Sequence, residues 1–459
     1  MIKQFTVTTV VVATLVLAAC KKEKGVETPP APPPPPVVTA ADKMKDTVIL
    51  YARDIYLWNT QIPSSFNARQ YADPDKIMTA IRPYSIEPGF TAPVDKWSFA
   101  YKKVDWDNVS GGIAKDFGLN VFFKAEGDLR VKAVEKNSPA GAAGIHRGWR
   151  IKAINGSTNM TTANANYIVE NVFYSNSSTF DLEKPDGSVV TLSLNAATYD
   201  ENPIYLDTVY VAGSKRTGYL VFNSFLGDTT AVYNNFQRIF NRFATEQVND
   251  VIVDLRYNGG GYVSVQDKLA NYLVPTAGNG GVMMRQVFNN LYSSWNESTN
   301  FTKLGTLNLP RIFFIVTSST ASASELLINN LKPYMDVKVV GPNPSYGKPV
   351  GYFPIGVGEW YIFPVSFRST NKNNEGSYFN GFPLDKQVAD GLDKDWGDRQ
   401  EASLAAALKY IETGSFAFNP PGETIGSTNT AYKKEAVIAG NRKLDEHEFK
   451  GAIDVKKRF

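Results

Sequence analysis

The sequence predicts an α/β protein in which a helical region and a glycine-rich β region precede a larger domain of alternating strands and helices. Apolar residues recur at helical spacing within residues 42–104. Short strand-like runs with frequent glycine fill residues 105–195. In residues 200–414, apolar runs typical of buried strands alternate with amphipathic helical patterns. That alternation is the order expected of parallel βα units, so this third region is predicted to be the main domain.

Residues 1–20 have the pattern of a targeting segment. Lys3 supplies a positive charge, and the apolar stretch from Val7 to Leu17 is too short for an ordinary membrane span. Cys20 follows two alanines, which resembles a bacterial lipoprotein signal whose cleavage leaves Cys20 as the lipidated N-terminus. The alternative is an ordinary signal peptide in which the cysteine falls by chance. Because Cys20 is the only cysteine of the chain, no intrachain disulfide can form.

Residues 21–41 predict a spacer between this segment and the folded part. The proline-rich stretch 29–36 favours extended polyproline II and spans roughly 25 Å at about 3.1 Å per residue. We therefore expect a cell-envelope lipoprotein, periplasmic or surface-exposed, that is held to the membrane through lipid on Cys20 and not by a spanning helix.

The first folded region, residues 42–104, predicts mostly helix. Asp73 followed by Pro74 marks a helix start, since proline suits the first helical turn. Trp58 and Trp97 are expected to pack in the core and not to contact a ligand. The residues that recur at helical spacing are Val48, Tyr51, Ala52, Ile55 and Trp58.

The composition excludes several classes of function. The net charge of +3 is small for 459 residues, and no basic block with interleaved aromatic residues points to nucleic-acid binding. With two histidines and one cysteine the chain has no metal-binding pattern, and we expect no cofactor. After Gly414 the sequence becomes polar with little periodicity, so residues 415–459 are predicted to be a mostly extended tail or a small appended element.

The order of motifs in residues 105–195 resembles a PDZ domain. A strand-like run at 129–134 precedes the small-residue helical turn at 138–145, which is followed by a glycine stop, a strand and the turn Asn155-Gly156. PDZ domains add a peptide strand to a sheet edge and hold its terminal carboxylate on backbone amides. The sequence departs from the family at Trp149, where an aspartate is usual.

The candidate carboxylate-binding loop of this region is Phe117-Gly118-Leu119-Asn120. An equally weighted alternative is that residues 117–123 form a core strand and bind nothing. His146 is expected to be a partly exposed loop residue without a ligand role.

Ser322 is the candidate nucleophile of the main domain. It lies in Thr320-Ala321-Ser322-Ala323-Ser324-Glu325, after the apolar run 312–316 and at the predicted start of a helix. The unpaired amides and positive potential of a helix N-terminus favour a developing anion, so the Ala323 amide is a natural oxyanion donor. A second donor is expected from Gly260 or Gly261 in the glycine turn after Asp254-Leu255-Arg256.

Lys348 is the candidate base, because His146 and His447 both lie far from this segment in the sequence. A free lysine has a pKa near ~10.4 and would be protonated at neutral pH, whereas burial can lower that pKa by ~3 units or more. The apolar neighbours Tyr346, Val350 and Tyr352 are compatible with burial. Each motif alone has a structural interpretation: a small-residue helix start, a solvated lysine, and an ion pair between Asp254 and Arg256.

Together these motifs resemble the C-terminal processing proteases, also called tail-specific proteases. The resemblance runs from about Asp42 to Ile411 and depends on residues 254–261, on residues 320–325 and on Gly347-Lys348. It implies a crotonase-like (ClpP/crotonase-type) α/β core with an inserted PDZ domain, and a Ser-Lys dyad that cleaves exported proteins near their C-termini. The implied roles are nucleophile for Ser322, general base for Lys348, and oxyanion hole for Ala323 with a glycine of 259–261.

One position departs from this family. Many members carry a glutamine four residues after the lysine, where this chain has Tyr352. Either the tyrosine hydroxyl replaces the amide, or another residue orients the lysine. The departure supports the alternative of a catalytically silent homologue that binds peptides on the cell envelope. A third alternative, a lipoprotein that handles lipid or polysaccharide with the same fold, has no sequence feature that requires it.

Overall fold

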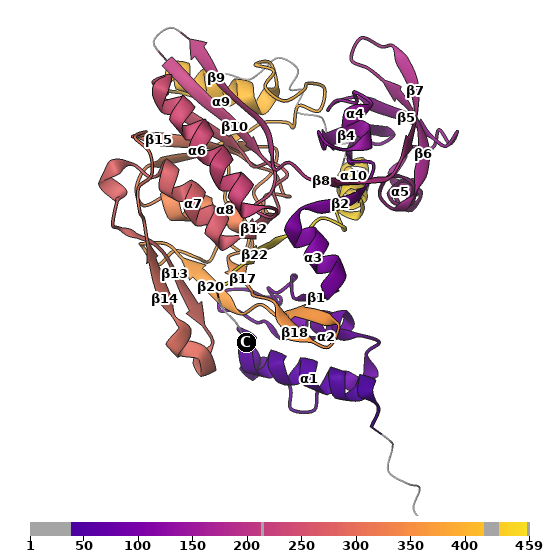
Figure 1. Cartoon of the computed structure of the whole chain (residues 1–459), viewed down its shortest axis with the longest axis vertical. Coiled ribbons are helices and arrows are strands. Elements are labelled where there is room, and N and C mark those ends of the chain that lie inside the picture. The colour runs from indigo at the N-terminus through magenta and orange to yellow at the C-terminus, as the bar shows by residue number, and fades with distance from the viewer. Residues whose placement is uncertain (1–37, 213–214, 417–430, 457–459) are drawn as a thin grey trace, which may run out of the picture. The chain divides into compact units, whose positions relative to one another are not determined.

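The computed structural model describes residues 38–212, 215–416 and 431–456 (Figure 1). The chain divides into residues 1–39 and residues 40–459, and the account below concerns the second unit. The predicted signal segment 1–20, the lipidation site Cys20 and most of the spacer 21–41 lie outside the described residues. Among the described helices, none is both long enough and apolar enough to cross a bilayer.

The N-terminal region is helical and shares its core with the main domain. It contains α1 (Ala40–Ile55), α2 (Pro74–Ile81) and the strand β1 (Phe99–Lys102). The Asp73 side chain accepts a hydrogen bond from the Lys76 amide and so caps α2, with Pro74 in its first turn. Trp58 and Trp97 are buried in this common core, as predicted.

The second region is a five-stranded antiparallel sheet with a core of its own. Residues 113–116 and 197–200 pair with each other where the chain enters and leaves this region, and the predicted boundary at residue 105 falls inside the preceding helix. The sheet order is β3-β4-β5-β6-β7, so β3 is an edge strand. The elements are α3 (Lys103–Gly111), β2 (Ile113–Asp116), β3 (Leu119–Ala125), β4 (Asp128–Val134), α4 (Pro139–Ala142), β5 (Arg150–Ile154), α5 (Ala165–Val169), β6 (Ser177–Glu183), β7 (Val189–Asn195) and β8 (Ala197–Asp200).

The main domain is built on a six-stranded sheet of order β21-β16-β15-β11-β10-β9. All neighbouring pairs are parallel except β9 with β10, which confirms the predicted parallel βα units. The strands are β9 (Ile204–Ala212), β10 (Lys215–Phe222), β11 (Asp250–Asp254), β15 (Arg311–Ile315), β16 (Asp336–Gly341) and β21 (Lys386–Gln387). The helices are α6 (Thr229–Thr245), α7 (Val263–Leu273), α8 (Ala323–Leu331) and α9 (Ala402–Thr413).

Side chains of this sheet alternate between two cores, as the two-residue period of a strand requires. Val251 and Val253 of β11 pack with α6, α7 and α8, whereas Ile252 packs with Leu404 and Leu408 of α9. Helices therefore cover both faces of the sheet (Figure 1).

Smaller sheets complete the main domain. β1 pairs with β19, and a four-stranded sheet of order β14-β13-β20-β17 lies beside α8. The strands are β12 (Gly260–Tyr262), β13 (Val282–Phe288), β14 (Glu297–Asn300), β17 (Val350–Gly351), β18 (Ile355–Val357), β19 (Trp360–Phe363) and β20 (Phe367–Thr370). Short single-turn helices are η1 (Asn59–Gln61), η2 (Ala68–Gln70), η3 (Arg82–Tyr84), η4 (Thr162–Asn164), η5 (Glu170–Tyr174), η6 (Thr276–Gly278) and η7 (Asn290–Trp295).

The C-terminal part forms α10 (Ala431–Leu444) and β22 (Gly451–Ile453). Of the two alternatives predicted for residues 415–459, the described residues fit a small appended element and not an extended tail. β22 pairs in parallel with the glycine-rich strand β12, far away in sequence.

Candidate active site

Ser322 occupies the sharp turn between β15 and α8. Its backbone has φ 59° and ψ −105°, a conformation that residues other than glycine rarely adopt. Such strain costs about 1–3 kcal/mol and persists where the surroundings enforce it, often at functional sites. The residue is 1% exposed, and its amide donates a hydrogen bond to Glu325 Oε2 at 2.9 Å. The turn therefore holds a serine at the N-terminus of a helix, as predicted.

Lys348 is as deeply buried as Ser322, at 1% exposure. Its amine lies 3.8 Å from the centre of the Tyr352 ring and 5.8 Å from that of Trp97. Burial holds the pKa of Lys348 well below its ordinary value; Asp95 and Glu325 oppose this shift, and Arg82 adds to it. A lysine with a lowered pKa can be neutral near pH 7, which is the state that a general base needs.

The structure places these two side chains around one small cavity, where each has a different hydrogen-bond partner. The Ser322 hydroxyl donates to the Val350 carbonyl at 3.5 Å, and the Lys348 amine donates to the Lys450 carbonyl at 3.0 Å. Among the described residues, no hydrogen bond joins Ser322 Oγ to Lys348 Nζ. Catalytic hydrogen bonds are often loose in the absence of substrate. The residues around the cavity are Ser322, Leu326, Lys348, Pro349, Val350, Ser369, Tyr378 and Ala452.

The predicted oxyanion donors also lie together. A Cβ atom added to Gly260 would lie 3.0 Å from the Ala323 nitrogen, so β12 passes directly beside the start of α8. Gly260 and Gly261 have φ of 104° and 142°, which favour glycine. The Gly260 amide already donates to Asn258 Oδ1 at 2.9 Å. Gly261 pairs with Ala452 of β22, so the assignment of Ala323 and a glycine of this turn as oxyanion donors stays a prediction.

Glu325 is a positioning residue that the sequence analysis did not assign. Its fully buried carboxylate accepts hydrogen bonds from the backbone amides of Ser322, Gly347 and Lys348 at 2.9, 2.6 and 2.8 Å, and from the Ser345 hydroxyl at 2.6 Å. Burial raises the pKa of Glu325, and these hydrogen bonds oppose that shift. One carboxylate thus connects the turn of Ser322 to the turn of Lys348. The serine-x-x-glutamate spacing of a helix capping box was the available signal.

Tyr352 does not replace the missing glutamine through its hydroxyl. That hydroxyl donates to the Lys450 carbonyl at 2.9 Å, and the lysine amine lies over the ring face instead. The first of the two alternatives offered for this position is therefore wrong in this conformation. Lys348 and Tyr352 both donate to the same carbonyl oxygen of the C-terminal part.

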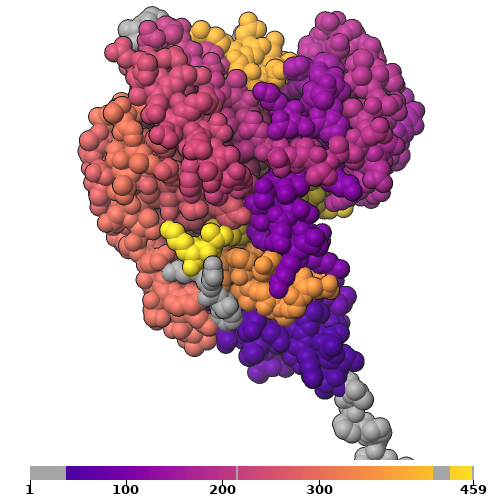
Figure 2. Space-filling model, viewed as in Figure 1, coloured from indigo at the N-terminus to yellow at the C-terminus, as the bar shows by residue number. Residues whose placement is uncertain are grey.

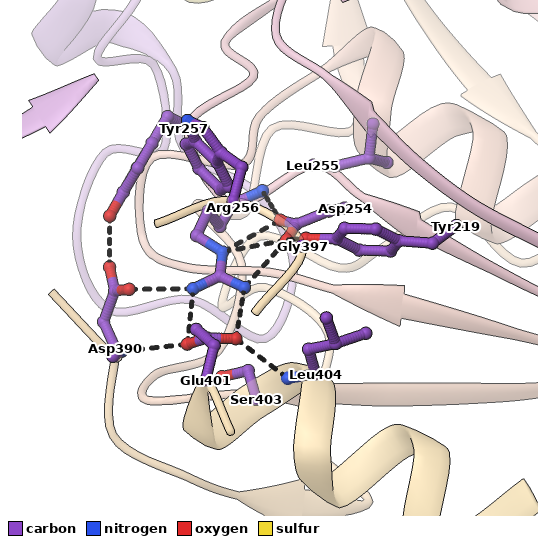
Figure 3. A network of polar contacts seen from close by, with 12 residues as sticks. Tyr219, Asp254, Leu255, Arg256, Tyr257, Asp390, Gly397, Glu401, Ser403 and Leu404 are labelled. Carbon is purple, nitrogen blue, oxygen red and sulfur yellow. Dashed lines mark hydrogen bonds and ion pairs between the residues drawn. The ribbon is translucent and has the colours of Figure 1, made fainter. Parts of the chain in front are cut away.

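A buried ionic network anchors the chain just before the glycine turn. Arg256 contacts Asp254 at 2.7 Å and both Asp390 and Glu401 at 2.9 Å, so its guanidinium lies among three carboxylates (Figure 3). The ion pair between Asp254 and Arg256 that the sequence allowed is thus present. Arg147 of the five-stranded region also contacts Asp390, at 2.7 Å. This network links the five-stranded region to the strand that precedes the glycine turn.

The loop predicted to bind a carboxylate leads into the edge strand β3. Phe117 and Leu119 are buried in the core of the five-stranded region, as the core-strand alternative requires. Gly118 has φ 74°, and its amide donates to Asp116 Oδ1 at 2.6 Å. Asn120 pairs with Ala133 in β4. His146 is 59% exposed in its side chain and contacts Asp395 at 2.9 Å.

No group of three or more potential metal ligands occurs among the residues that the structure describes. The candidate site itself holds a strained serine, a buried lysine and the backbone amides of the two turns. These are the components of acyl transfer through a serine nucleophile.

Comparisons with known proteins bear on the fold and on the family of the segment that contains this site. No curated protein matches the chain in sequence. A solved structure described as an S41 protease from Bacteroides fragilis matches with a TM-score of 0.65 and 21% identity, over 80% of this chain and 97% of that one. The photosystem II D1 C-terminal processing protease matches with a TM-score of 0.47 and 19% identity, over 77% of this chain and 94% of that one. The first likeness supports the mixed α/β fold.

The family assignment comes from the segment that contains the site. Residues 216–367 match peptidase family S41, and this range includes the glycine turn, Ser322 and Lys348. Residues 216–367 are therefore similar to peptidase family S41, and the predicted resemblance to C-terminal processing proteases is confirmed at the level of this family.

Proposed function

We propose that this chain is a serine endopeptidase in which Ser322 is the nucleophile and Lys348 the general base. The observation that carries the proposal is the shared cavity: within a family S41 domain, a strained serine and a fully buried lysine with a lowered pKa line the same small space. No histidine is needed, because desolvation of the amine supplies a base in the working range of pH.

The proposed reaction follows from these positions. The neutral Lys348 amine takes the proton of Ser322 Oγ while that oxygen attacks the peptide carbonyl carbon. The oxygen of the tetrahedral intermediate faces the Ala323 amide and the 259–261 turn, where backbone donors stabilise its charge. The protonated lysine then gives its proton to the leaving amine as the peptide bond breaks. Water, deprotonated by the same lysine, hydrolyses the acyl-enzyme and restores Ser322.

The proposed substrates are exported proteins that are cleaved near their C-termini. The five-stranded region has an edge strand, β3, that contacts the short helix η5, and we assign it as a PDZ domain that binds the substrate tail or gates the site. A lipid on Cys20 would hold the enzyme on the cell envelope, facing the periplasm or the exterior. No nucleic acid and no cofactor takes part.

A second candidate function is a silent peptide-binding homologue. It is favoured by one observation: the Lys348 amine is hydrogen-bonded to the Lys450 carbonyl and not to Ser322. The proposal of a peptidase requires that this contact can be released.

An unstructured protein such as β-casein tests the two candidates. We expect the purified chain to produce fragments, and Ser322→Ala or Lys348→Ala to lower kcat by at least about 10³-fold while folding is retained. The exposed residues Ser294 and Lys136 supply matched controls, because Ser294→Ala and Lys136→Ala leave the rate unchanged. Complexes without fragments from the unmodified chain would favour the silent homologue, and full activity of either site variant would refute the mechanism.

A further inference from the structure

Residues 431–454, here called the C-terminal segment, contact both places where the fold offers a binding site for a peptide. Its strand β22 pairs with β12 beside the candidate active site, and its helix α10 packs against β3 and α5 of the five-stranded region. Figure 1 shows α10 near α5, and β22 near β12. The two contacts have different chemistry, and each resembles the binding of a substrate.

At the candidate active site the segment lies between two parts of the chain, here called the two walls. One wall is the glycine turn 259–261, and the other is the stretch from Val350 to Tyr352. On one side, the Gly451 amide donates to the Gly259 carbonyl at 2.9 Å. On the other side, the Tyr352 amide donates to the Ala452 carbonyl, and the Asp454 amide donates to the Tyr352 carbonyl, both at 3.0 Å. The segment is thus an extended strand held by main-chain hydrogen bonds, which is how a protease binds a peptide without reading its sequence.

Glycines in both walls fit the backbone of this strand closely. A Cβ atom added to Gly259 would lie 2.0 Å from the Phe449 carbonyl oxygen, and one added to Gly260 would lie 2.3 Å from that of Gly451. On the opposite wall, a Cβ atom added to Gly351 would lie 2.8 Å from the Ala452 carbonyl oxygen. Glycine is the residue that allows another backbone to approach so closely. The walls therefore provide a channel that accepts a polypeptide strand.

The segment also engages the catalytic base. The Lys450 carbonyl accepts hydrogen bonds from the Lys348 amine and the Tyr352 hydroxyl, and Ala452 lines the cavity that holds Ser322. Ala452 and Ile453 are 4% and 1% exposed, so a second peptide cannot enter while the strand is in place. Figure 2 shows that part of the chain's yellow end reaches the surface, beside violet and orange parts of the chain.

At the five-stranded region the segment forms hydrogen bonds with backbone groups of the edge strand β3. The Asn441 side chain accepts a hydrogen bond from the Phe123 amide at 2.7 Å and donates one to the Phe123 carbonyl at 2.9 Å. These are the two bonds that a paired strand would make with this residue. Leu444 is 1% exposed and belongs to the core of that region. Lys132 forms ion pairs with Asp445 and Glu448 at 2.8 and 2.5 Å.

We propose that the C-terminal segment is an intramolecular substrate mimic, so that the folded chain is a latent protease. A protein substrate occupies the two places where this segment now lies, the channel between the glycine turn and Tyr352 and the edge of β3. Release of the segment frees the Lys348 amine for Ser322 and opens both sites together. This inference rests on the proposed function as a peptidase.

The first test weakens the docking of the segment. Leu444→Glu places a charge in the core of the five-stranded region, whereas Ile438→Glu changes a residue of the same helix that is 48% exposed and serves as the matched control. We expect Leu444→Glu to raise the rate of β-casein cleavage by at least about fivefold, as a shift towards an open population predicts, and Ile438→Glu to leave it unchanged. A folded Leu444→Glu chain that cleaves no faster than the unmodified chain overturns the inference.

A second test does not depend on the folding of that variant. In the full chain with Ser322→Ala, amide hydrogen exchange is measured with and without saturating β-casein. We expect exchange at residues 451–453 and in α10 to rise when casein binds, because the substrate replaces the segment. Bound casein with unchanged exchange at these amides overturns the inference. Absence of casein binding to Ser322→Ala carrying Leu444→Glu overturns it as well.

A synthetic peptide of residues 445–456 supplies the third measurement. Added to the Leu444→Glu chain, it is expected to raise KM for casein without changing kcat, whereas a peptide of scrambled sequence has no effect. If the unmodified chain and all variants leave casein intact, the proposed peptidase function fails, and the exchange experiment still decides where casein binds. If the unmodified chain cleaves casein but release variants and exchange show no change, only the substrate mimic is refuted.

Discussion

Two buried basic side chains of the main domain, those of Arg256 and Lys348, have opposite surroundings. Both are 1% exposed. Arg256 contacts three carboxylates within 2.9 Å, whereas no carboxylate lies within salt-bridge distance of Lys348 among the described residues. Arg256 remains charged, with a pKa raised well above its ordinary value: burial lowers it, but Asp254, Glu401 and Asp390 outweigh that effect. Lys348 lies over aromatic rings, and its pKa is lowered.

This difference distinguishes an arginine with a structural role from a lysine that can act as a base. The fully paired charge of Arg256 connects the three segments that carry Asp254, Asp390 and Glu401. Removal of one partner leaves an uncompensated buried charge and destabilises the fold. A charge denied a partner is unstable as a cation, which is the property that a general base requires. Inspection of carboxylate partners therefore distinguishes the two roles where burial alone does not.

The largest effect is expected from Arg256→Met. The substitution leaves Asp254, Asp390 and Glu401 buried without their cation, and breaking such a set costs about 3–5 kcal/mol. Chemical denaturation should show this loss in the free energy of unfolding. Arg216→Met, at an exposed arginine, is the control. A loss below 1 kcal/mol would contradict the structural role.

Lys348→Met should raise the free energy of unfolding, in contrast to Arg256→Met, and it should abolish activity. Burial of the amine without full compensation costs about 1–3 kcal/mol, and methionine removes that cost. Between the lowered pKa of Lys348 in the folded chain and the ordinary lysine pKa, the unfolded chain binds a proton that the folded chain lacks. Stability of the unmodified chain should therefore rise with pH towards the ordinary lysine pKa near ~10.4, and Lys348→Met should flatten that rise in denaturation curves.

Glu325→Gln tests whether one carboxylate couples the two catalytic turns. An amide cannot accept all the hydrogen bonds that Glu325 receives, so the turns of Ser322 and Lys348 lose their alignment. We expect kcat to fall by about 10–100-fold with little change in KM, since Glu325 is not among the groups proposed to touch substrate. Glu412→Gln, at an exposed glutamate, should change neither constant. An equal rise in KM would indicate a general structural defect.

The smallest effect concerns Asp267, a buried carboxyl in α7. Burial raises its pKa to about 7; Lys456 opposes the shift, while Asp454 and Glu297 add to it. The folded chain thus holds a proton that the unfolded chain releases at lower pH, so its contribution to stability is lost as pH rises through about 7. The free energy of unfolding, measured by thermal melting, should fall more between pH 6 and pH 9 in the unmodified chain than in Asp267→Asn, by roughly 1 kcal/mol. Parallel curves would contradict the shift.

Sequence reasoning reached the features that local pattern determines. The buried strands of the main domain, such as β11, and the helix start at Asp73 depend on neighbouring residues, and both formed as predicted. The serine turn and the glycine turn were likewise identified from contiguous motifs. What they do together depends on distances in space, which is why the proximity of Gly260 to Ala323 needed the structure.

The C-terminal segment was predicted only as one of two alternatives, for a physical reason. β22 has three residues, and its hydrogen bonds are made with Gly259 and Tyr352, which are distant in the sequence. A strand this short has no periodicity of its own. Glu325 was missed in the same way: its spacing from Ser322 signals a helix cap, but its bonds to Gly347 and Lys348 cross between two turns.

The setting of Lys348 also limits how the chain can be divided. Trp97, which lies over the lysine amine, and Asp95, which acts on its pKa, come from the N-terminal region, and the Lys450 carbonyl comes from the other end of the chain. The segment that matches the peptidase family, residues 216–367, contains none of these three. A recombinant fragment of that segment would hold both proposed catalytic side chains, Ser322 and Lys348, and still expose the lysine amine to water. The smallest unit able to carry a neutral lysine is therefore larger than the smallest unit that sequence comparison identifies.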